Sequence, residues 1–171
     1  SDPFALNNDG NPFPMTEFGG NFLFMAFDGV NPRVLWKTDG TEAGTTPLGQ
    51  VDIRTANPFL GNLTNVSGTQ FFTANDGIHG EELWKSDGTT AGTLLVSDIN
   101  PGMQDTILRY LTNVNGTLFF TASDSINGLE LWKSDGNSAG TTIVKDINLG
   151  ANDSDPFALN NDGNPFPAAE F

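Results

Sequence analysis

Short apolar runs along this chain alternate with clusters of Gly, Asn, Asp and Thr, and no stretch of ten or more residues keeps a helical apolar stripe. Runs rich in Val, Phe, Thr and Trp that are bounded by turn residues are typical of strands. In the last full unit the pattern predicts strands at 109–114, 117–122, 129–134 and 141–147. Between the first two, Asn115-Gly116 predicts a two-residue hairpin turn, because both central positions need a positive φ.

The same pattern recurs every 48 residues, as the spacing of Trp36, Trp84 and Trp132 shows. The second and third tryptophans lie in Glu-Leu-Trp-Lys-Ser-Asp-Gly at 82–88 and 130–136, and the first copy reads Val-Leu-Trp-Lys-Thr-Asp-Gly at 34–40. Ala-Gly-Thr follows each copy, at 43–45, 91–93 and 139–141. An internal repeat of this length predicts one supersecondary unit stacked several times.

A longer period overlies the first. Residues 154–167 repeat residues 1–14 without a change, and Glu17-Phe18 returns as Glu170-Phe171 at the same offset of 153. We interpret this as a segment of a longer tandem array with a period of 153 residues. The alternative is that the two ends of the sequence simply overlap.

Both faces of the predicted strands carry apolar groups. In 118–122, Leu118, Phe120 and Ala122 share one face and Phe119 lies on the other, whereas a sheet with one solvated face would alternate apolar and polar positions. The sequence therefore predicts an all-β protein with three four-stranded antiparallel, blade-like repeats of about 48 residues, resembling a β-propeller. A β-solenoid or a tandem β-sandwich is the structural alternative. The predicted repeat core is Trp36, Trp84, Trp132, Phe72 and Phe120.

The predicted organisation divides the chain into three repeats with a duplicated end. Residues 1–18 are a connector with the first strand, 19–66, 67–114 and 115–153 are the repeats, and 154–171 start a next unit or connect subunits. A propeller closes with about four to eight blades, so three blades leave apolar faces and unpaired strand edges that favour association. The candidate connector residues are the duplicated Pro and Phe positions: Pro3, Phe4, Pro12, Phe13, Pro14, Pro156, Phe157, Pro165, Phe166 and Pro167.

Charge and composition disfavour several classes of function. The formal net charge is −14, which disfavours nucleic acid as a partner, and no apolar run has membrane-spanning length, so no membrane insertion is expected. Cys is absent, and the single His79 has Asn31 and Asn127 at the equivalent positions. The sequence therefore lacks the Cys and His residues that a zinc site or a nucleophilic triad requires. The adjacent acids Glu81-Glu82 start a strand and are expected to be solvated rather than paired for catalysis. These observations predict that the protein is not an enzyme.

Calcium is the one cofactor that the pattern suggests. Aspartates recur with the 48-residue period in two series: Asp28, Asp76 and Asp124, and Asp39, Asp87 and Asp135. Asp beside Gly and Asn carbonyl groups can form oxygen cages for Ca²⁺. The other interpretation is that each Asp serves its own turn, by bonding the nearby backbone.

The repeated Glu-Leu-Trp-Lys-Ser-Asp-Gly, followed by Ala-Gly-Thr, resembles the ELWxxDGT repeat family. The resemblance covers residues 19–150 in three copies, and the first copy departs from the motif with Pro32-Arg-Val in place of Gly-x-Glu. Members are large bacterial surface or secreted proteins described as propeller-like. The resemblance implies an exported, extracellular protein of bacterial origin with a structural or adhesive role, and it supplies no catalytic residues.

The sequence thus favours a structural extracellular repeat protein. We expect it to associate with copies of itself into a surface array or fibre, through terminal strands and apolar blade faces. The alternative is a propeller-type adhesion module that binds glycans or another surface protein, with calcium. That alternative rests on fold analogy alone.

Overall fold

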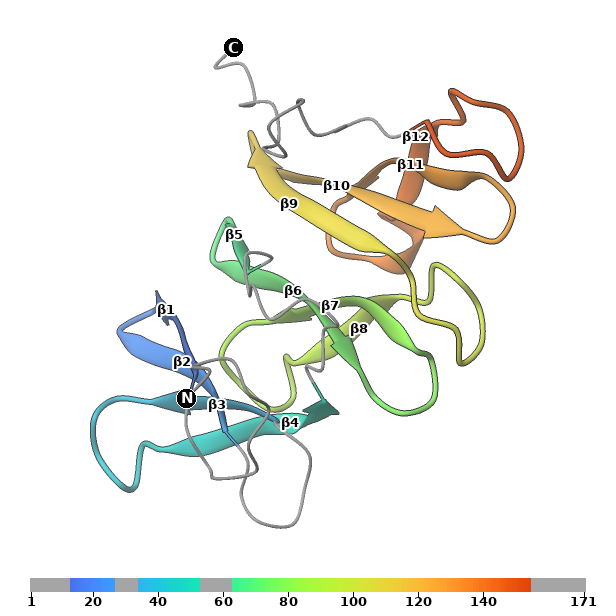
Figure 1. Ribbon diagram of the computed structural model, residues 1–171. Coiled ribbons are helices and arrows are strands. Elements are labelled where there is room, and N and C mark those ends of the chain that lie inside the picture. Colours follow the sequence, from blue (N-terminus) through green and yellow to red (C-terminus); the bar gives the residue numbers. More distant parts are fainter. Residues whose placement is uncertain (1–12, 27–33, 53–62, 155–171) are drawn as a thin grey trace, which may run out of the picture.

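The computed structural model describes residues 13–26, 34–52 and 63–154 (Figure 1). Within these residues the protein is all-β, with twelve strands and one short 3-10 turn, η1 (Ser138–Gly140). The strands form three four-stranded antiparallel sheets, and consecutive strands of the chain lie side by side in each sheet. The predicted all-β class and the three repeated sheets are confirmed.

The sheets recur with the 48-residue period, and the first strand of each sheet falls just before the repeat boundaries predicted at 19, 67 and 115. Sheet 1 contains β1 (Phe13–Phe18), β2 (Asn21–Ala26), β3 (Val34–Thr38) and β4 (Thr46–Asp52). Sheet 2 contains β5 (Thr64–Val66), β6 (Thr69–Asn75), β7 (Glu81–Ser86) and β8 (Leu94–Ser97). Sheet 3 contains β9 (Leu108–Val114), β10 (Thr117–Asp124), β11 (Gly128–Ser134) and β12 (Thr142–Lys145). A single backbone pair, Asp52 of β4 with Asn75 of β6, links sheets 1 and 2.

The turn predicted at Asn115-Gly116 has the expected backbone, and the first hairpin turn of sheet 2 has the same one. Asn115 and Gly116 have φ values of 51° and 83°, and Ser67 and Gly68 have 51° and 84°. The side-chain oxygen of Asn113 accepts a hydrogen bond from Gly116 N at 3.0 Å, which closes the turn at its base. This turn sets the register of β9 on β10, in which Val114 pairs with Thr117.

The three sheets follow one another in chain order, with sheet 2 between the other two (Figure 1). Two apolar clusters hold them together. The first joins sheets 1 and 2 through Leu23, Leu35, Leu48, Phe72, Ala74 and Trp84. The second joins sheets 2 and 3 through Val66, Phe71, Leu83, Val96, Ile99, Leu108, Leu111, Leu118, Phe120, Ala122 and Trp132. Sheet 2 is therefore covered on both faces, which explains why its strands lack a polar face.

Among the described residues, no helix is long and apolar enough to cross a membrane.

Candidate functional site: a repeated interface between sheets

The Asp-Gly-Thr motif, which is Asp-Gly-Asn in sheet 3, builds the loop that follows the third strand of each sheet. Asp87 Oδ1 accepts hydrogen bonds from Thr89 N at 2.9 Å and from Thr89 Oγ1 at 2.7 Å. Asp39 receives the same two bonds from Thr41, and Asp135 accepts one from Asn137 N at 2.9 Å. The side-chain hydrogen bond from Thr89, followed by the backbone bond, lowers the pKa of Asp87. These carboxylates therefore serve their own loops.

The Ala-Gly-Thr motif closes the same loop from the other side. A Cβ atom at Gly92 would lie 2.0 to 2.4 Å from the Asp87 carboxylate, so only glycine leaves room for that carboxylate. The next residue, Thr93, has its hydroxyl oxygen 2.8 Å from that of Ser86, and both are buried. The motif is thus explained by loop geometry and does not require a ligand.

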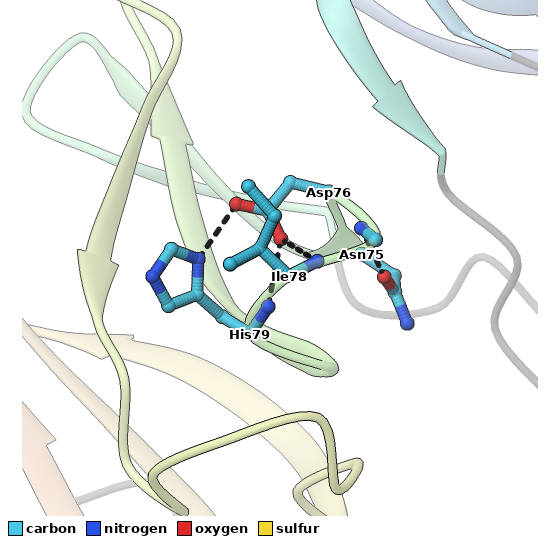
Figure 2. A network of polar contacts seen from close by, with 5 residues as sticks. Asn75, Asp76, Ile78 and His79 are labelled. Atoms are coloured by element: carbon cyan, nitrogen blue, oxygen red, sulfur yellow. Dashed lines mark hydrogen bonds and ion pairs between the residues drawn. The ribbon is translucent and has the colours of Figure 1, made fainter.

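A second loop holds the only histidine (Figure 2). Asp76 Oδ1 accepts hydrogen bonds from Ile78 N and His79 N, both at 2.9 Å, and Oδ2 lies 2.7 Å from His79 Nδ1. The hydrogen bond with Asp76 raises the pKa of His79. In sheet 3, Asn127 Nδ2 donates to Asp124 Oδ2 at 2.7 Å. Asn127 therefore makes the same contact with Asp124 that His79 makes with Asp76.

The predicted calcium ligands lie in separate loops of this kind. Among residues 13–26, 34–52 and 63–154, no group of three or more His, Cys, Asp or Glu side chains could hold a metal ion. Asp28 lies outside the described residues. The calcium site remains a prediction from sequence.

The glutamate of the Glu-Leu-Trp motif was expected to be solvated, and that expectation is wrong. Glu82 is fully buried, and its carboxylate accepts hydrogen bonds from Ile99 N at 2.9 Å, Asn100 N at 3.1 Å and Thr106 Oγ1 at 2.5 Å. Burial raises the pKa of Glu82, and these three bonds oppose the rise. Because Thr106 leads into sheet 3, Glu82 fixes the path of the chain from one sheet to the next.

Glu130 repeats this arrangement after the last sheet. It is fully buried and accepts hydrogen bonds from Ile147 N and Asn148 N at 3.4 Å and from Ser154 Oγ at 2.5 Å. Asp153 Oδ1 accepts a bond from Leu129 N at 2.8 Å, as Asp105 does from Glu81 N. The chain leaving sheet 3 is therefore held in the same way as the chain leaving sheet 2. Ser154 is also the first residue of the duplicated segment.

The face of sheet 2 that packs on sheet 3 carries Phe71, Leu83 and Val96, and we call it the forward face. The face that packs on sheet 1 carries Phe72, Ala74 and Trp84, and we call it the rear face. The same repeat positions define the forward and rear faces of sheets 1 and 3.

At the junction of sheets 2 and 3, Lys85 Nζ donates a hydrogen bond to the carbonyl oxygen of Gly136 at 2.7 Å. At the junction of sheets 1 and 2, Lys37 Nζ donates to the equivalent carbonyl of Gly88 at 2.8 Å. Both junctions thus place a forward face on a rear face, with the same polar contact beside the apolar cluster.

The forward face of sheet 3 has no following sheet among the described residues. Val114, Val144 and Ile147 are 46%, 46% and 58% exposed, whereas Val66, Val96 and Ile99 at the same repeat positions are 7%, 4% and 6% exposed. Phe119 and Leu131 are half-buried, whereas Phe71 and Leu83 are buried. The same residue types are therefore buried or exposed according to whether another sheet follows.

The rear face of sheet 1 shows the complementary exposure. Phe22 is 41% exposed, whereas Leu118 at its repeat position in sheet 3 is fully buried. Phe24 and Trp36 stack on each other with ring centroids 6.4 Å apart and are only half-buried. Of the predicted repeat core, Trp84, Trp132, Phe72 and Phe120 are buried and Trp36 is half-buried.

The predicted connector falls mostly outside the described residues. Only Phe13 and Pro14 are described, and they begin β1, where Pro14 pairs with Phe24 before a shift of register. Proline is tolerated there because β1 is an edge strand. The connector role of these residues and of the other duplicated Pro and Phe positions remains a prediction.

No family model, curated protein or solved structure matches this chain. The resemblance to the ELWxxDGT family therefore depends on the repeated motif alone.

Proposed function

We propose that the protein is a structural, extracellular repeat protein without catalytic activity, which self-associates through the unpaired faces of its terminal sheets. In this proposal the sheets are blades, and successive copies extend their stack into a surface array or fibre. The extracellular location follows from the resemblance to bacterial surface proteins and not from any residue of the site.

The exposure of the forward face of sheet 3 carries the proposal. Val96 and Val144 occupy the same repeat position, yet Val96 is 4% exposed and Val144 is 46% exposed. Fully burying a side chain of this kind contributes about 1.5 to 3 kcal/mol, so several such positions together give a strong tendency to associate. Adjacent exposed apolar side chains also mark interaction sites on soluble proteins.

The polar chemistry of the repeats supports a structural role. Asp87 and Asp135 accept hydrogen bonds within their own loops, and Glu82 and Glu130 accept bonds from the chain that leaves their sheets. Carboxylates that accept hydrogen bonds from the protein itself hold the chain in place. This structural role explains why these acids recur in each repeat, and it requires no catalytic reaction.

The proposal is tested by sedimentation and electron microscopy of the 171-residue chain over a wide concentration range. We expect oligomers that grow with concentration, and we expect Val144→Asp to abolish them because the new carboxylate would be buried without a partner. Ile126→Asp is the matched control, since Ile126 and its repeat equivalent Ile78 are both exposed, at 72% and 65%. A parent chain that stays monomeric throughout would show that the proposal is wrong.

The adhesion module remains the alternative function. It predicts discrete closed rings and saturable binding to glycans that removal of calcium abolishes. Assembly without glycan binding would favour the structural role.

A further inference from the structure

We infer that the partner of the forward face of sheet 3 is the rear face of sheet 1 in a second copy of this chain. This inference rests on the proposed self-association and specifies which surfaces meet. It describes a head-to-tail contact, in which a third junction repeats the two that the chain already makes internally.

The apolar positions of the forward face match from sheet to sheet. Leu35, Leu83 and Leu131 hold one position, and the first two are fully buried by the next sheet. At another position Leu48 and Val96 are buried, whereas Val144 is 46% exposed. Sheet 3 thus presents to solvent the residue types that sheets 1 and 2 use to pack against a rear face.

The rear face of sheet 1 matches those of sheets 2 and 3. Phe24 and Trp36 hold the places of Phe72 and Trp84, which are 2% and 7% exposed where sheet 1 covers them. Phe22, Phe24 and Trp36 form a continuous aromatic stack, with Phe22 and Phe24 centroids 6.3 Å apart. This face offers aromatic side chains of the kind that dominate apolar interfaces.

A polar contact sets the register of the new junction. Lys37 and Lys85 each donate to the carbonyl oxygen of a glycine that lies 51 residues further along. Lys133 is the third lysine of the series and is exposed, and Gly40, the first glycine of the series, is exposed in the loop of sheet 1. The geometry therefore assigns the Gly40 carbonyl of the second copy as the acceptor for Lys133 Nζ.

The chain leaving sheet 3 is already placed for this junction. Ser154 Oγ donates to the buried Glu130, as Thr106 Oγ1 donates to Glu82 where the chain passes into sheet 3. Ser154 also opens the copy of residues 1–14. A second copy docked on sheet 3 therefore takes the place that the next 153-residue period would take in a tandem array.

A head-to-tail contact is heterologous, so it either closes into a ring or continues into a fibre. It also predicts that two singly blocked variants complement each other. Val144→Asp blocks the forward face and leaves the rear face intact, and Phe22→Asp does the reverse. Each variant alone should associate at least about a hundredfold more weakly than the parent, because every contact then includes one unpaired buried carboxylate.

The test is sedimentation velocity of each variant and of their equimolar mixture, after circular dichroism has confirmed that both are folded. We expect monomers from each variant alone and a one-to-one dimer that does not grow from the mixture. Dimers of one variant alone would overturn the head-to-tail contact in favour of like faces meeting. Monomers in the mixture, with a parent chain that assembles, would also overturn it and leave self-association standing. A parent chain that stays monomeric would show that the proposed self-association itself is wrong.

A second measurement does not depend on those variants. The chain contains no Cys, so Lys133→Cys and Thr41→Cys can be introduced in separate chains and joined by a short bismaleimide. A cross-link between the two variants within the assembled state supports the contact between Lys133 and the Gly40 loop. Assembly without that cross-link, although both thiols react with a monofunctional maleimide, would overturn it.

Discussion

Lys85 Nζ lies 2.7 Å from the carbonyl oxygen of Gly136, so a lysine in β7 of one sheet donates a hydrogen bond to the loop after β11 of the next. Lys37 makes the same contact with Gly88 at 2.8 Å. The lysine of the repeated motif is therefore part of the interface between sheets. Its third copy, Lys133, is exposed.

The same substitution at Lys85 and at Lys133, which share one repeat position, should affect stability differently. Lys85→Met should lower the free energy of unfolding by about 1.5 kcal/mol, because a charged donor to a part-buried carbonyl is lost. Lys133→Met should change it by less than about 0.5 kcal/mol at concentrations where the chain is monomeric. Urea denaturation measures both values, and equal losses would contradict the role given to Lys85.

Gly92 is predicted to be irreplaceable for a steric reason. A Cβ atom there would lie 2.0 to 2.4 Å from the Asp87 carboxylate, so Gly92→Ala should destabilise the protein by about 2 to 4 kcal/mol. Asp87→Ala alone should cost less, because the loop loses only its bonds from Thr89. In the double variant the clash is absent, so Gly92→Ala should add little to Asp87→Ala. Thermal unfolding of the three variants checks this, and additive losses would rule out the clash.

The stability of sheet 2 should depend on pH through Glu81. Burial raises the pKa of Glu81 to about 7 from 4.5, so the folded state holds its proton more tightly than the unfolded state. The stabilisation from this group is fully present below pH 4.5 and is lost as pH rises through about 7, at no more than about 1.4 kcal/mol for each pH unit.

Glu81→Gln isolates this effect, since the amide has the same shape and does not titrate. The variant and the parent should unfold at similar urea concentrations at pH 4, and the variant should be more stable by about 1 to 2 kcal/mol at pH 8, because partial exposure to solvent reduces the effect of the pKa shift. A difference that is constant between the two pH values would show that Glu81 does not titrate in this range.

His79 should titrate above its usual range. The hydrogen bond with Asp76 raises the pKa of His79 from 6.5, so this pair stabilises the fold below pH 6.5 and the contribution is lost as pH rises through the folded value. Because the chain has one histidine, a single imidazole resonance followed by NMR reports this pKa directly. A value at or below 6.5 would contradict the contact.

The repeat itself supplies the control for His79. In sheet 3 the equivalent Asn127 donates to Asp124 at 2.7 Å, so His79→Asn should keep the loop folded and remove its pH dependence. Between about pH 6 and 8, the free energy of unfolding should then fall less steeply with rising pH than it does in the parent.

Calcium removal should leave the folded chain unchanged in the described sheets. Asp39 and Asp87 accept two hydrogen bonds each within their own loops, so these loops are satisfied by protein donors. We expect the melting temperature to be the same in EDTA and in millimolar calcium. A rise of several degrees with calcium would restore the calcium interpretation of the repeated aspartates, since a ligand that binds only the folded state stabilises it.

The sequence by itself determined the period, the strands and the turns, because these depend on neighbouring residues. Asn115-Gly116 predicts its own hairpin, whatever lies elsewhere in the chain. The apolar groups on both faces of 118–122 predict a sheet covered on both sides, but among the described residues these apolar groups are buried only on the face with Leu118, Phe120 and Ala122. The last predicted strand, 141–147, is shorter in the structure, where β12 ends at Lys145. There the N–H groups of Ile147 and Asn148 point to Glu130 and no longer pair with a strand.

Only the tertiary structure decided which acid is fully buried and which apolar residue is exposed. Glu81 and Glu82 are adjacent acids in the sequence, but only Glu82 meets donors from three other positions, and those donors become neighbours through folding. Val96 and Val144 have the same repeat position and differ in burial because one sheet has a successor and the other does not among the described residues. A local pattern encodes the sheet, whereas burial depends on the number of sheets that stack.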